Sequence, residues 1–196
     1  MKSKAKTLRV KSNLREVKRR AKDNDAANKS LVRNTTRGGI TMVANIIRFV
    51  LLMLLALLVG TMFGVWIGFN PAGLSAPAYV EHQQLAIRSL NTLLPAMGAV
   101  CILLIVTLAF LSKGDSRSRY LLIAAAAFMV VAALVTRFAN QPINAVVMTW
   151  SAQAPAANWA QMRDEWWQWH IVRSLAGIIA LALTVVAVLV SKRTSE

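Results

Sequence analysis

The hydrophobic residues of this chain are gathered into four long runs without charged side chains. The runs cover residues 49–69, 89–112, 120–136 and 174–191. A helix rises about 1.5 Å per residue and the hydrocarbon core of a bilayer is about 30 Å thick, so about 20 apolar residues can cross it. We therefore predict an all-α integral membrane protein, a four-helix bundle with spans at about 47–69, 92–112, 119–139 and 171–191.

The two longer connections predict amphipathic helical extensions of the spans. Asn70-Pro71-Ala72-Gly73 is a turn signal, and Ser75 followed by Pro77 is typical of a helix start. At 100° per residue, a helix from about residue 76 has one polar stripe, formed by Glu81, Gln84, Arg88 and Asn91. A second extension is expected to begin near residue 158, after a proline, and to continue into the fourth span.

The segment Asn140-Gln141-Pro142-Ile143-Asn144 follows the third run. Proline removes a backbone donor and disfavours helix in the residue before it, so we expect the helix to break here. Broken helix at membrane depth is tolerated where it is buried in protein or lines a cavity. Asn140 and Asn144 are then expected to support freed backbone groups, to bind a ligand, or to do both.

The second extension, which leads into the fourth span, carries cationic and aromatic residues on a single helical face. Measured from Arg163, this face includes Trp166, Trp167, His170 and Arg173, whereas Asp164 and Glu165 point elsewhere. An aromatic belt at the bilayer interface explains most of the tryptophans, and snorkelling to the headgroups explains either arginine taken alone. His170 fits neither explanation, and polar residues at such depth usually mark a site.

Composition and charge predict how the chain is oriented in the membrane. The chain is 56% hydrophobic and has a formal net charge of +15. Its Lys and Arg residues cluster in residues 1–40, in the connection 113–119 and at 192–193. By the positive-inside rule we predict a multi-pass protein of the cell (inner) membrane with both termini in the cytoplasm and the amphipathic helical extensions on the non-cytoplasmic side.

Three segments are predicted on this basis: a disordered basic cytoplasmic tail over 1–42, the membrane domain over 43–191, and a cytoplasmic tail over 192–196. No apolar stretch with a cleavage site precedes the first span, which is therefore expected to be an uncleaved anchor. The basic tail is expected to adhere to membrane lipid, and without interleaved aromatics it predicts no specific nucleic-acid partner. A translation start at Met42, which would remove the tail, is the alternative.

Small residues recur every four positions along the first span, at Ala56, Gly60, Gly64 and Gly68. Such a stripe allows close helix approach in lipid. Its partner is either another span of the same chain, such as the face at residues 124–127, or the first span of a second copy in a homodimer.

These polar and aromatic residues also carry a family resemblance. The chain resembles the anthrone-oxygenase-like family of small four-span membrane proteins over about residues 47–190, through Arg137, Asn140-x-Pro142-Ile143-Asn144, Trp159, Arg163, Trp166, His170 and Arg173, preceded by Gln83 or Gln84 with Asn91 and Pro95. Most bacterial members have no assigned activity. Many relatives carry asparagine at the position of His170, so a histidine-dependent chemistry does not transfer directly.

The resemblance implies a cofactor-independent oxygenase that oxidises a polycyclic phenol or similar apolar substrate with molecular oxygen at an outward-facing pocket. Such a reaction needs a base, groups that stabilise the resulting anion, and a dry aromatic pocket. The implied roles are base for His170, electrostatic stabilisers for Arg173 and Arg137, and substrate binding for Asn140, Asn144, Trp166, Trp167, Gln84 and Asn91.

A non-enzymatic membrane binding or scaffold protein that holds a lipid, a quinone or a partner helix is the alternative. Ligation of metal or haem by His82 and His170 is not expected, because ligand number and spacing are insufficient. The single cysteine, Cys101, lies in an apolar run and is expected to serve packing. No phosphate-binding loop or nucleophile elbow appears, which disfavours ATPase and hydrolase functions.

Overall fold

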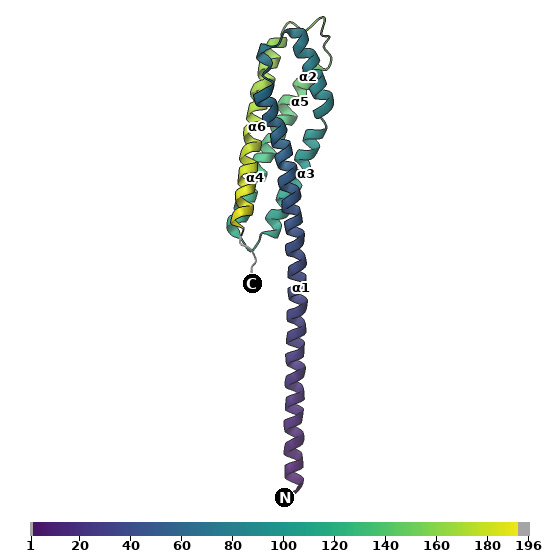
Figure 1. Ribbon diagram of the computed structural model, residues 1–196, viewed down its shortest axis with the longest axis vertical. Coiled ribbons are helices and arrows are strands. Elements are labelled where there is room, and N and C mark those ends of the chain that lie inside the picture. The colour runs from purple at the N-terminus through teal and green to yellow at the C-terminus, as the bar shows by residue number, and fades with distance from the viewer. Residues whose placement is uncertain (1, 192–196) are drawn as a thin grey trace. The chain divides into compact units, whose positions relative to one another are not determined.

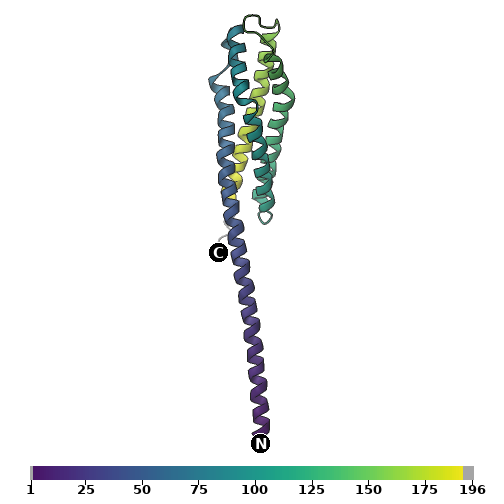
Figure 2. The same cartoon turned by 90° about the vertical axis from the view of Figure 1, so that its right-hand side faces the viewer.

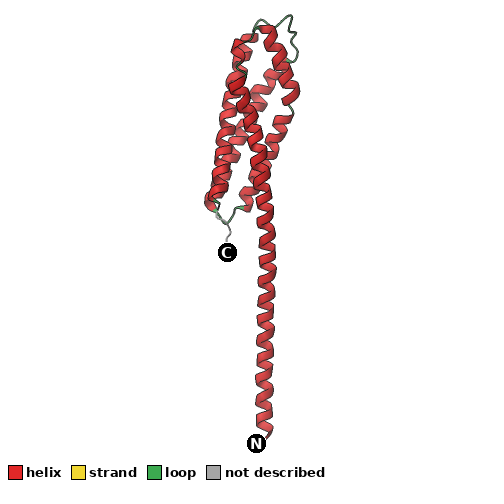
Figure 3. Ribbon diagram, in the orientation of Figure 1, coloured by secondary structure: helices red, strands yellow, loops and turns green. Residues whose placement is uncertain are grey.

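The computed structural model describes the backbone of residues 2–191, so the predicted tail at 192–196 lies outside the described residues. The chain is all-α, as predicted (Figures 1 and 3). Its helical elements are α1 (Lys2–Gly68), η1 (Pro71–Gly73), α2 (Ala76–Leu90), α3 (Leu93–Leu111), α4 (Ser116–Val135), η2 (Thr136–Asn140), α5 (Gln141–Val147) and α6 (Trp159–Val190).

The chain divides into two units between Asn45 and Ile46. In the first unit the described residues are helical, which differs from the disordered tail that composition predicts. The reason is local, because Lys, Arg, Ala and Leu are good helix formers. Lys29 Nζ also pairs with Asp25 Oδ2 one turn earlier, at 2.7 Å.

The second unit contains the membrane bundle. Four helical stretches are long and apolar enough to cross a bilayer, at residues 28–73, 93–111, 116–147 and 159–190. The prediction of four spans is therefore confirmed. The fourth stretch is longer than predicted because the extension from about residue 158 and the span form one helix, α6, and the third is longer because the helix continues past residue 139. The extension at residues 76–90 is instead a separate helix, α2, which a turn at residues 91–92 divides from α3. Within this unit α1, α3, α4 and α6 run alongside one another in both views (Figures 1 and 2).

The third span does not break at Pro142, and that prediction was wrong. α4 continues through η2, a π-helical turn in which the Gln141 N–H donates to the Thr136 carbonyl five residues back. This wider turn gives the proline ring room, and Pro142 then lies in the first turn of α5, where its missing N–H costs little. The helix therefore continues, and Asn140 and Asn144 both point into the bundle, where they are buried.

Small residues let the helices approach closely in the core. α6 contributes Gly177, Ala180 and Ala187, which are buried against the apolar side chains of the other spans. A Cβ built on Gly177 would lie 3.3 Å from Val59 Cγ2, so α1 and α6 meet here. At the other end of the core, Ser118 Oγ donates to the Ala187 carbonyl at 3.0 Å and joins α4 to α6.

The stripe of small residues on α1 is not used within the bundle. Ala56, Gly60 and Gly68 are exposed, and a Cβ built on Gly60, Gly64 or Gly68 would have nothing within 4 Å. The expectation that another span of the same chain covers this stripe was therefore wrong. A homodimer through the stripe stays a prediction.

Replacing Gly177 by alanine should lower the thermal unfolding midpoint of the detergent-solubilised protein, whereas Gly60→Ala should preserve or raise it. The added methyl at 177 must displace Val59, whose side chain is stiff in a helix, and such overpacking costs about 1–3 kcal/mol. At Gly60 the methyl meets open space and alanine favours helix. Equal midpoints for the two variants would contradict this packing.

Candidate functional site

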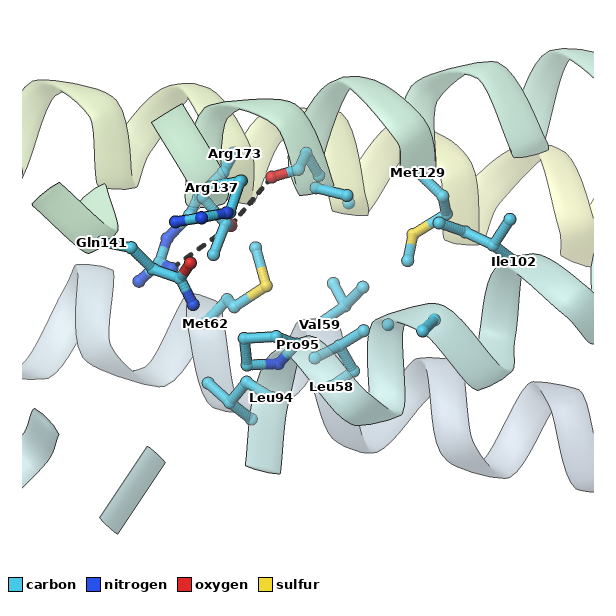
Figure 4. Close-up of a pocket in the computed structure, with 16 residues that line it drawn as sticks. Leu58, Val59, Met62, Leu94, Pro95, Ile102, Met129, Arg137, Gln141 and Arg173 are labelled. Atoms are coloured by element: carbon cyan, nitrogen blue, oxygen red, sulfur yellow. Dashed lines mark hydrogen bonds between the residues drawn. The ribbon is translucent and has the colours of Figure 1, made fainter. Parts of the chain in front are cut away.

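An apolar cavity of about 260 Å³ lies between α1, α3, α4 and α6 (Figure 4). Met129 and Ile102 line one end, whereas Arg137, Gln141 and Arg173 gather at the other. Buried apolar cavities of about 150 Å³ already bind benzene. This cavity is therefore large enough for a compound of more than one ring, with its polar edge toward the arginines.

Arg173 is fixed by neutral acceptors. Its Nη2 and Nε atoms lie 2.9 and 3.2 Å from Nδ1 of His170, and its Nη1 lies 3.5 Å from Oγ1 of Thr136. The guanidinium also lies over the Trp166 ring, 5.7 Å from its centroid. No carboxylate among the described residues is within 4.0 Å of Arg173. The cation at the end of the cavity therefore has no acidic partner in this part of the chain.

His170 is held in one tautomer. Its Nε2 lies 3.0 Å from the Met62 carbonyl, which can only accept, so Nε2 carries the proton. Nδ1 is then the atom with the lone pair, and the Arg173 guanidinium donates to it. The ring is 1% exposed and lies between two tryptophans, Trp166 at 5.1 Å and Trp167 at 5.7 Å.

The base predicted at His170 stays a prediction, and the geometry shows what its ring nitrogens contact. Both of its ring nitrogens already have protein partners, so no lone pair faces the cavity. A neutral imidazole that accepts from Arg173 instead orients the guanidinium without neutralising its charge. His170 is therefore a positioning residue in this arrangement.

Side-chain amides join three helices beside this pair. Asn144 Oδ1 accepts from Nε1 of Trp166 at 2.8 Å and from Nε2 of Gln83 at 3.5 Å, and Asn144 Nδ2 donates to Oδ1 of Asn91 at 2.8 Å. Asn140 Nδ2 donates to the Trp166 carbonyl at 3.0 Å. Asn140 Oδ1 is buried and has no hydrogen-bond partner among the described residues. The amides of Asn140 and Asn144 thus hold Trp166 in place.

Of the predicted site residues, the structure brings together His170, Arg173, Trp166, Trp167, Asn140, Asn144 and Asn91. Arg137 is exposed and lies at the rim of the cavity. Gln84 lies outside the site: its Nε2 donates to the Val147 and Trp150 carbonyls, at 3.0 and 2.9 Å, and caps the end of α5.

Gln83, which was not among the predicted site residues, is the buried glutamine of the pair. It is 3% exposed and contacts Asn144. One signal in the sequence could have found it, because Gln83 lies four residues from both Tyr79 and Ile87 and so shares their apolar face on α2.

An aromatic cluster anchors α2 to the start of α6. The Tyr79 ring lies 5.9 Å from the Trp159 ring, and the Arg163 guanidinium lies 4.9 Å above Trp159. The Tyr79 hydroxyl is buried and has no hydrogen-bond partner among the described residues. Burial raises the pKa of Tyr79 to about 12, and this outweighs the opposite effect of the nearby Arg163.

The described residues contain no group of three or more His, Cys, Asp or Glu side chains that could hold a metal ion. His82 instead stacks against Phe69, with ring centroids 5.3 Å apart. Cys101 is a buried free cysteine within the core cluster.

Comparison with known proteins gives a match at the level of the family. The family model described as anthrone oxygenase matches residues 84–183, from α2 to within α6. The matched region includes the π turn, the Arg173–His170 pair and the amides of Asn91, Asn140 and Asn144 but not Gln83, and is shorter than the 47–190 expected from the motifs. The searches of curated proteins and of solved structures found no match.

Raising the pH should test the burial of Tyr79. Because its folded pKa lies above the usual value of about 10, its contribution to stability is complete below about pH 10 and declines as the pH rises toward 12. By that linkage the free energy of unfolding should fall by about 2–3 kcal/mol over this pH range. In urea unfolding of solubilised protein, Tyr79→Phe should remove this part of the decline in the free energy of unfolding. The exposed Tyr120→Phe should keep it, and equal pH profiles for the two variants would contradict the assignment.

Proposed function

Because this chain belongs to the anthrone oxygenase family, we propose that it binds a membrane-soluble, weakly acidic ring compound in the apolar cavity and presents the anion of that compound to molecular oxygen. The observation that carries the proposal is Arg173, a guanidinium without an acidic partner among the described residues, at the polar end of a cavity that is otherwise apolar. A cation held by neutral groups in a low dielectric favours an anionic ligand.

The net reaction proposed by analogy with the family name is the conversion of a ring methylene and one O₂ into a ring carbonyl and water. The anion of such a substrate gives up electrons to oxygen more readily than the neutral compound does. Stabilising the anion therefore lowers the barrier, and an oriented guanidinium in a water-poor site does so with little reorganisation. The apolar walls, including Val59, Met62 and Pro95, would keep the anion away from bulk water.

Each polar residue has a part in this proposal. Arg173 pairs with the ligand oxyanion, and His170 holds Arg173 at the required angle. Trp166 is fixed by Asn144 and Asn140, and its ring stacks on His170 and lies under Arg173. Arg137, exposed at the rim, would attract the acidic edge of the ligand toward the cavity.

Binding without turnover is the second class of function that this cavity can serve. A quinone or a lipid with an acidic headgroup would use the same apolar walls and the same arginine. Oxygen consumption separates the two classes, because a binding protein would take up the ligand without using O₂.

Arg173→Gln should weaken binding of a hydroxylated anthrone by roughly ten- to a hundredfold, the usual worth of one charged hydrogen-bond pair of about 1.5–3 kcal/mol. Tryptophan quenching in reconstituted protein measures the affinity, and an oxygen electrode measures turnover. Arg88→Gln, an exposed arginine outside the linings of the described cavity, is the matched control and should change neither. Undiminished binding by Arg173→Gln would refute the proposal.

Replacing His170 separates a positioning role from that of a base. His170→Asn keeps an acceptor for Arg173, so its affinity for the anthrone should stay within about threefold of wild type, whereas His170→Ala should lose about tenfold or more. Affinity and turnover should fall together in His170→Ala. If both variants bound normally but lost turnover, His170 would be the base and the positioning role would be wrong.

A further inference from the structure

Two smaller hollows continue from the apolar cavity toward the end of the bundle that carries η1 and α2. The middle hollow has a volume of about 50 Å³, and it shares Met62, Thr136 and Arg173 with the cavity. The outer hollow has a volume of about 210 Å³ and is lined by His82 and Pro71. The middle and outer hollows share Val65, Gln83, Ala86, Leu90 and Trp166. Because neighbouring hollows have walls in common, the three lie in a row.

The middle hollow has the size and lining of a water site. Its volume is about a third of the 150 Å³ that accommodates benzene, so a ring compound does not fit, whereas one or two waters at about 30 Å³ each do. A buried water needs two to four polar partners, and the wall includes the side-chain amides of Gln83, Asn91 and Asn144 and the guanidinium of Arg173. The middle hollow therefore admits water and excludes the ligand that the apolar cavity would take.

The proposed chemistry leaves the proton of the acidic ligand without an acceptor in the protein. Both nitrogens of His170 are occupied, and Arg173 is already a cation. The titratable side chains that line the three hollows, among the described residues, are Arg137, Arg173, His170 and His82. Only His82 lies in the outer hollow, where a proton would arrive after it had passed the polar middle.

We infer that the row of hollows is a water path that carries away the proton of an acidic ligand as the ligand ionises against Arg173. The inference rests on the proposed function. The ligand O–H bond breaks, its electron pair stays on the ligand oxygen beside Arg173, and the proton passes to water in the middle hollow and then to the outer hollow. The guanidinium favours the ionised ligand, because it attracts the oxyanion.

Ala86 is the position at which this path can be closed without touching Arg173, because it lines the middle and outer hollows but not the apolar cavity. The probe is a hydroxyanthraquinone, whose anion absorbs at longer wavelength than its neutral form. With the full-length protein in vesicles, stopped-flow tryptophan quenching follows binding and visible absorbance follows ionisation. Ala86→Phe should slow ionisation at least tenfold, with quenching rate and final affinity within about twofold of wild type.

Three further variants complete the test. Leu90→Ala widens the same constriction and should speed ionisation, whereas Ala86→Ser should behave as wild type. Ala96→Phe places the same ring at an exposed position of α3 that lines none of the three hollows, and should also behave as wild type.

Each other result overturns the inference. If Ala86→Phe slowed quenching and ionisation equally, the ligand itself would pass through the hollows. If neither Ala86→Phe nor Leu90→Ala changed the rate of ionisation, the hollows would not carry the proton. If the wild type bound the probe without an anion band, the anion site at Arg173 would fail, and the proposed function with it.

Discussion

The hydrogen bonds from Arg173 to His170, and from His170 to the Met62 carbonyl, are the interactions on which the polar part of the bundle depends. In lipid there is no solvent to satisfy a polar group, so each must find a partner within the protein. The chain meets this demand for arginine with a neutral ring instead of a carboxylate. The result is a cation that is held firmly in place and keeps its charge. Burying such a charge costs free energy, and an anionic ligand would offset that cost.

The surrounding helices can be understood as supports for this pair. Trp166 stacks on His170 and is held through its indole N–H by Asn144 and through its carbonyl by Asn140. Both asparagines face inward because the π turn at Thr136–Asn140 lets the helix continue past Pro142. The turn also places the Thr136 hydroxyl near Arg173. One local widening of a helix thus supplies support for the arginine from two directions.

The cavity and its neighbouring hollows separate two environments that an oxygenase of an acidic substrate would need. A dry chamber favours the reaction of an anion with oxygen, but ionisation needs a route for the proton. Arg173 lines both the apolar cavity, which includes Met129, and the middle hollow, which includes Asn144, so the guanidinium lies at the boundary between them. In the proposed function, this boundary is where the ligand would ionise and its anion would react.

The sequence by itself determined the four spans, the all-α class, the family motifs and the shared face of Trp166, His170 and Arg173. These follow from hydrophobic run length and helical periodicity, which are properties of each segment alone. The tertiary structure decided which groups meet: that Gln83 and not Gln84 faces the amides, that the α1 glycines face outward, and that the helix passes Pro142 through a π turn. It also decided that both nitrogens of His170 are occupied, because the Met62 carbonyl that binds one of them comes from a helix more than 100 residues away in the chain, a contact that no local pattern encodes.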